Sequence, residues 1–162
     1  MAGVAFNGSN ISDSTKSGHV TYDIERWVPS YCTGWDQYGN CISTGGGYWT
    51  SAGSGSTGAK ITGSKVQSNS NVYVNQKPIA CVGDVSTSEN WRADPPVPSG
   101  GGDTRIVNIR PSTSGSGSGS ISSGSTKVFV GGKAVAFIGS DVRTHLGTQA
   151  RIDTGSTSVF VG

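Results

Sequence analysis

The sequence is poor in apolar residues and in charge. Only 33% of its 162 residues are hydrophobic and no long apolar run occurs, so we expect no membrane-spanning segment. No stretch keeps helical periodicity over an ordinary helix length, which argues against a helical fold. The 12 basic and 10 acidic residues are spread along the chain, so we expect no nucleic-acid partner. Residues 1–4 lack the basic and apolar regions of a secretory signal, and we therefore expect synthesis in the cytoplasm.

Glycine, in contrast, is abundant. The chain has 26 glycines together with many serines and threonines. At this length, such a composition favours one small all-β domain with a thin core. The Gly/Ser/Thr-rich stretches have a composition typical of flexible linkers. They are residues 44–47, 54–58 and 112–120.

One short hairpin-like segment is the unit from which the chain is built. Residues 128–130 (Val-Phe-Val) and 135–138 (Val-Ala-Phe-Ile) are β-branched and aromatic runs typical of strands. Between them, Gly131 and Gly132 tolerate the positive φ angles of a tight turn. We name the first run the VFV segment and the second the VAF segment.

Further copies complete the pattern. Residues 72–84 repeat the whole hairpin, with Cys81 in place of the aromatic residue and no counterpart of Ser140. Residues 152–162 repeat only the VFV half, and residues 4–10 only the VAF half. Three segments of each kind in circular order predict a closed, pseudo-threefold body of three β-hairpins, one split between the termini. Closure also removes open sheet edges.

Three loops join each VAF segment to the next VFV segment. They span approximately residues 10–71, 85–127 and 142–158. We interpret residues 1–162 as a single domain with insertions at about 20–62 and 91–118. Within the second insertion, residues 105–110 alternate apolar and polar side chains and predict a strand that pairs with a neighbour.

The first loop holds most of the aromatic residues. They are Trp27, Tyr31, Trp35, Tyr38, Tyr48 and Trp49. One interpretation is that the insertion folds back as a small hydrophobic cluster that covers the thin core. The other is that residues 27–49 form a contact surface for a partner protein, because Trp and Tyr are common interface anchors.

A metal site is the clearest chemical possibility. His19, Cys32, Cys41 and His145 form a Cys₂His₂ set, which suits a tetrahedral structural zinc. Both histidines follow a VAF segment, so the pseudo-threefold would bring their loops to the same end. A disulfide between the two cysteines, free thiols or ordinary surface histidines are the alternatives. We expect Cys81 to be a buried small hydrophobic residue, because it replaces an aromatic residue of the other copies.

No catalytic arrangement stands out, and we expect no enzyme. The acidic residues are not paired in the sequence, and the Gly/Ser runs lack the lysine of a phosphate-binding loop. A cell-wall hydrolase, the enzymatic alternative, would need two placed carboxylates. Asp23 and Glu25 are the candidates for that role.

Residues 72–84 and 124–141 resemble the PAAR-repeat pattern. Its elements are a Gly-Ser pair, a short apolar strand, an Asn-Gly-Lys-Pro turn, a strand like Ala-Ala-Arg, and Gly-Asp. The Pro-Ala-Ala-Arg element itself is divergent, being Pro-Ile-Ala-Cys at 78–81 and Ala-Val-Ala-Phe at 134–137. The resemblance implies a small cone that caps and sharpens a trimeric β-helical, membrane-piercing spike of a contractile phage tail or a type VI secretion system.

The same resemblance implies a structural zinc, or iron in its place, held mainly by histidines at the apex. His19 and His145 match the family's ligand region, whereas residues 84–90 supply no histidine. For this reason Cys32 and Cys41 complete the expected ligand set.

The function implied is that of a spike tip. One copy is expected per trimeric spike or hub protein, with transient membrane contact during penetration. The expected base contacts are Tyr73, Phe129 and Phe160, which are equivalent under the threefold. The chain leaves no room for a toxin domain, which favours a virion tail tip on a phage baseplate over the secreted tip of a type VI system. The alternatives are a binding module whose loop 27–49 contacts another virion protein or a host receptor, and the hydrolase.

Overall fold

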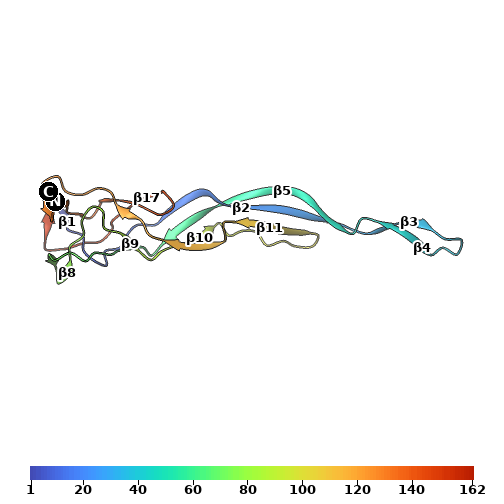
Figure 1. Cartoon of the computed structure of the whole chain (residues 1–162), viewed down its shortest axis with the longest axis horizontal. Coiled ribbons are helices and arrows are strands. Elements are labelled where there is room, and N and C mark those ends of the chain that lie inside the picture. The colour runs from blue at the N-terminus through green and yellow to red at the C-terminus, as the bar shows by residue number, and fades with distance from the viewer.

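The structure, a computed structural model of residues 1–162, is built of β-strands only, which confirms the all-β prediction. It contains no helix, and so none long and apolar enough to cross a membrane. Figure 1 shows an elongated molecule. A wider body at one end carries both termini, and a long hairpin extends from it to the opposite end.

Three two-stranded hairpins form what we call the base. They are β7 (Tyr73–Val74) with β8 (Lys77–Pro78), β14 (Phe129–Val130) with β15 (Lys133–Ala134), and β1 (Ala2–Gly3) with β18 (Phe160–Val161). In the last hairpin Ala2 lies opposite Val161 and Gly3 opposite Phe160. The predicted hairpin split between the termini is therefore confirmed.

The two continuous base hairpins turn as their sequences predict. Asn75 and Gln76 have φ angles of 52° and 65°, and Gly131 and Gly132 have φ angles of 57° and 80°. Two successive left-handed residues are what a type I′ hairpin turn requires. The same turn geometry is thus reached once with glycines and once with polar side chains.

The three VAF segments meet in a closed ring of backbone hydrogen bonds. The amide of Ala5 donates to the carbonyl of Ala136, that of Ala136 to Ala80, and that of Ala80 to Ala5, each at 2.9 Å. All three alanines are 0% exposed. Larger side chains would not fit where three strands converge in a close-packed interior. The ring confirms the closed pseudo-threefold body.

Each VAF segment ends in the same turn. A glycine with positive φ is followed by a side chain that accepts a hydrogen bond from the amide three residues earlier. The acceptors are Ser9, Asp84 and Ser140, at 3.1, 2.7 and 3.0 Å. The expectation that residues 72–84 lack a counterpart of Ser140 is therefore wrong, because the carboxylate of Asp84 takes the place of the serine hydroxyl.

Above the ring lies a second tier of short strands. It comprises β6 (Lys65–Val66) with β9 (Ser86–Thr87), and β13 (Ser120–Ile121) with β16 (Asp141–Arg143) and β17 (Gln149–Arg151). The largest buried cluster has only nine residues, among them Ile11, Val66, Ile121 and Ile152, so the core is thin as predicted.

Cys81 packs in a second buried cluster with Val4 and Val135. It is a free cysteine and 3% exposed, which confirms the expectation of a buried small hydrophobic residue. Burial, together with the nearby carboxylate of Asp84, raises the pKa of its thiol. Cys81 is therefore held as the uncharged thiol.

A five-stranded antiparallel sheet forms what we call the shaft. Its order is β11 (Thr104–Arg110), β2 (Ser14–Val28), β5 (Tyr48–Thr62), β10 (Glu89–Asp94) and β12 (Ser114–Gly117). β11 pairs with β2, which confirms the strand predicted for residues 105–110. β12 lies inside the Gly/Ser run 112–120 and pairs with β10, so this run forms a strand in spite of its linker-like composition.

Beyond the shaft, β3 (Tyr31–Trp35) and β4 (Cys41–Gly45) form what we call the tip hairpin. It lies at the end of the molecule farthest from the termini (Figure 1). The interpretation that the aromatic insertion covers the core is therefore wrong, because the insertion leads away from the core. Only Trp27 and Trp49 contact each other, with ring centroids 5.4 Å apart on the paired strands β2 and β5.

Candidate docking face and apex site

The base presents three equivalent exposed aromatic residues. Tyr73, Phe129 and Phe160 occupy the same position in the three base hairpins and are 62%, 56% and 48% exposed. The valine before each one is also exposed; these are Val72, Val128 and Val159. Large apolar side chains gathered in water on a small domain mark an interaction surface. The structure thus brings the three predicted partner contacts together at the end that carries the termini.

The gaps between the base hairpins are unequal. One gap is closed, since the Ser156 hydroxyl donates to Asn75 Oδ1 at 2.6 Å and Asn75 Nδ2 donates to the Ser158 hydroxyl at 3.4 Å. The other two are clefts. One is lined by Met1, Phe137 and Val161, and the other by Asn71, Val130 and Lys133. The strands of the base therefore follow the pseudo-threefold symmetry, but the clefts between them do not.

At the junction of the second tier and the shaft, a buried carboxylate holds His145. The side chain of Glu89 is 0% exposed, and its Oε2 lies 2.5 Å from Nδ1 of His145. The same oxygen accepts a hydrogen bond from the His145 amide at 2.9 Å. Oε1 accepts one from the hydroxyl of Ser86. Three hydrogen bonds from two residues of the second tier satisfy the carboxylate, as burial requires.

Glu89 takes in the second repeat the place that His145 has in the third. It lies five residues after Asp84, as His145 lies five residues after Ser140. Asp84 and Ser140 are equivalent turn residues in the structure. Sequence reasoning missed Glu89 because only His and Cys were considered as apex residues. The equal spacing would have identified it once Asp84 was aligned with Ser140.

Glycines of the 112–120 run make room for this site. A Cβ on Gly117 would lie 2.4 Å from the ring of His145, and one on Gly119 would lie 2.7 Å from Oε1 of Glu89. Gly115 likewise lies against the ring of Trp91, which is buried. The glycines are therefore needed for close packing, which explains why a sequence of linker composition forms a strand.

His19 lies close to the same site. Its ring meets Trp91 edge to face, with centroids 4.9 Å apart. Burial, followed by the charges of Lys16 and His145, lowers the pKa of His19. The two histidines thus lie in each other's electrostatic field, at the same end of the base, as the pseudo-threefold predicted.

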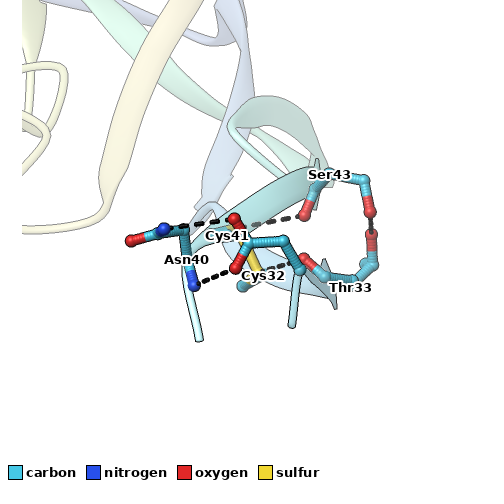
Figure 2. Close-up of a disulfide and its surroundings, with 7 residues drawn as sticks. Cys32, Thr33, Asn40, Cys41 and Ser43 are labelled. Atoms are coloured by element: carbon cyan, nitrogen blue, oxygen red, sulfur yellow. Dashed lines mark hydrogen bonds between the residues drawn. A yellow bond between two sulfur atoms is a disulfide. The ribbon is translucent and has the colours of Figure 1, made fainter. Parts of the chain in front are cut away.

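The cysteines lie elsewhere. Cys32 and Cys41 form a disulfide in the tip hairpin, as Figure 2 shows, far from both histidines along the molecule. The predicted four-ligand site of His19, Cys32, Cys41 and His145 is therefore wrong, because the two sulfurs are bonded to each other. The disulfide alternative is the one that the structure shows.

The remaining donors do not make a closed zinc site. Nε2 of His145 is buried without a hydrogen-bond partner, and a carboxylate on the other ring nitrogen is common in metal-binding histidines. However, no group of three or more His, Cys, Asp or Glu side chains is placed to hold a metal. A structural zinc uses four protein ligands. Binding of a zinc or iron ion stays a prediction, which elemental analysis of the purified protein tests.

The carboxylates considered for a hydrolase are engaged in cross-strand pairs on the shaft. Glu25 lies 2.8 Å from Arg105, and Asp23 lies 3.6 Å from Arg110. Asp23 also accepts a hydrogen bond from Asn108 at 2.9 Å. Their positions are explained by the pairing of β11 with β2.

We expect reduction of the disulfide to loosen the tip hairpin alone. A closed loop of this length contributes about 3 kcal/mol by restricting the unfolded chain, and a two-stranded hairpin is marginal without such help. Amide hydrogen exchange should show lost protection at residues 31–45 after reduction and unchanged protection in the base. The Cys32→Ser/Cys41→Ser variant should match the reduced protein. Protection that is lost in the base, or kept in the tip, would contradict this assignment.

The sequence matches one known protein family. A sequence model of the PAAR motif matches residues 53–142, more than half of the chain. The matched part contains two of the three base hairpins and Glu89. No curated protein and no solved structure shows significant similarity to the chain. By its sequence match and by its closed ring of three repeated hairpins, the chain belongs to the PAAR-motif family.

Proposed function

We propose that this protein caps a trimeric β-helical spike and forms its pointed end. PAAR-motif membership supports a spike-tip role in a contractile injection apparatus. The observation that carries the proposal is the base, where three hairpins of one chain present Tyr73, Phe129 and Phe160 at equivalent positions. A single chain with pseudo-threefold symmetry can match three identical partner chains, each hairpin meeting one of them.

In this arrangement the base faces the spike, and the shaft and tip hairpin point away from it. The termini and the exposed aromatic residues of the base lie at one end, and the narrow hairpin at the other (Figure 1). The protein therefore lengthens the spike as well as capping it. The cross-strand pairs of β2, β5 and β11 hold the extension together without a large core.

The disulfide supports a tip that works outside the cytoplasm, because disulfides persist in oxidising surroundings. A phage tail tip, at the baseplate, is our first candidate. The secreted tip of a type VI system is the second candidate. Both assignments include brief contact with the target membrane.

Association with the spike tests the proposal. The trimeric spike protein of the same particle is mixed with the purified chain, and the complex is isolated by size-exclusion chromatography. One chain is expected for each spike trimer. A chain that forms its own trimer, or that never joins the spike, would remove the capping role.

A further inference from the structure

Exposed apolar side chains gather at two ends of the molecule, and docking of the base accounts for only one of them. The second group is on and beside the tip hairpin: Tyr31, Trp35, Tyr38, Ile42 and Tyr48 are 59%, 60%, 79%, 68% and 55% exposed. Patches of this kind on a soluble protein mark a binding surface.

The tip carries almost no charge. Between Arg26 and Lys60, Asp36 is the only charged residue. Asp36 Oδ1 accepts hydrogen bonds from the amides of Tyr38 and Asn40 at 2.8 and 2.9 Å, and Oδ2 accepts one from Asn40 Nδ2 at 3.1 Å. The bonds from Asn40 are the main reason that the pKa of Asp36 is lowered. This carboxylate is therefore used to shape the turn.

Two further polar side chains of the tip hairpin are also bonded to each other. The hydroxyls of Thr33 and Ser43 lie 2.9 Å apart across the strands, beside the disulfide (Figure 2). What remains for a partner is a set of aromatic side chains on a covalently closed hairpin. Closure lowers the entropy lost when such a surface binds.

We propose that the tip hairpin binds lipid bilayers by placing its aromatic side chains in the interfacial region. Trp and Tyr favour this region because one part of each ring is apolar and the other can hydrogen-bond to water. The absence of lysine and arginine means that no cation has to be desolvated. It also predicts that anionic headgroups are not required.

A sugar or peptide ligand is less well matched to this surface. Such ligands bind in concave sites with convergent polar groups. The main clefts of the protein lie along the base and the shaft, and four polar side chains of the tip are bonded in two pairs, Thr33 with Ser43 and Asp36 with Asn40. The inference deepens the proposed function, since it gives the leading end an affinity for membranes. It is tested on the free protein, so its failure would leave spike capping untouched.

The test uses the full, oxidised chain and vesicles of phosphatidylcholine, with or without phosphatidylglycerol. We expect cosedimentation with both compositions, little dependence on salt, and a blue shift of tryptophan emission. The Trp35→Ser/Tyr38→Ser variant should partition about tenfold or more weakly, because buried apolar area sets interfacial affinity. The matched control, Tyr73→Ser/Phe129→Ser, removes two exposed aromatic residues of the base and should bind like the parent.

Three results would overturn the inference. The first is that the parent protein fails to bind vesicles, and the second is that the tip variant binds them as well as the parent. The third is that the base control loses binding while the tip variant keeps it. If the chain does not bind vesicles but binds a host surface protein or polysaccharide through the tip hairpin, it is a receptor-binding module instead. Circular dichroism and melting temperature establish that each variant is folded.

Discussion

Glu89→Ala is expected to lower the free energy of unfolding by about 3–5 kcal/mol, because each buried donor left without its acceptor costs about 1–3 kcal/mol. The substitution leaves the Ser86 hydroxyl and both the amide and Nδ1 of His145 without their acceptor. These groups belong to the second tier and Glu89 to the shaft, so the two parts lose a shared contact. Thermal unfolding followed by circular dichroism should show a melting temperature lower by roughly 10 °C.

Two variants control this experiment. Glu25→Ala removes a carboxylate whose partner, Arg105, is largely in water, and should cost less than about 1 kcal/mol. Glu89→Gln keeps a side chain of the same shape that can still accept a hydrogen bond, and should fall between the two. If Glu89→Ala has the melting temperature of the parent, the buried carboxylate does not join the second tier to the shaft.

Phe129→Asp is expected to weaken spike binding by about a hundredfold or more, because a central aromatic anchor is lost and a charge is buried in its place. The variant should still fold, since Phe129 is 56% exposed in the free chain. Surface plasmon resonance on immobilised spike trimer measures the effect, and Trp35→Ser at the tip hairpin serves as the control. Equal losses in both variants, or none in Phe129→Asp, would show that the base is not the docking face.

The base could be predicted from the sequence because its information is local and repeated. A VFV segment, two turn residues and a VAF segment specify each hairpin, and the third copy becomes visible once residues 4–10 and 152–162 are joined. The alanine ring follows from the same alignment, since Ala5, Ala80 and Ala136 stand at the centre of the three VAF segments.

The site formed by Glu89, His145 and His19 could be predicted only in part. The threefold pattern placed His19 and His145 at one end, but the position of Cys32 and Cys41 depends on the direction in which the first insertion leaves the body. Two cysteines nine positions apart in the sequence are compatible with a metal and with a disulfide. Only the long pairing of β2 with β5 shows that they are carried to the far end.

The strand in the Gly/Ser run 112–120 could not be predicted, for a different reason. Strand pairing needs no particular side chain. Composition also does not show where the backbone of a glycine lies against an aromatic side chain. Gly115 and Gly117 are required because Trp91 and His145 lie against them, and these contacts join residues far apart in the sequence. Glu89 was missed for another reason, since only His and Cys were considered at its position in the repeat.

The most direct test of the capping role is the mass of the intact complex. Native mass spectrometry of the chain bound to its spike should give one chain per three spike subunits, with no free trimer of the chain. A complex with three chains per trimer, or a chain that binds to the side of one subunit, would contradict the match between three hairpins and three partner chains.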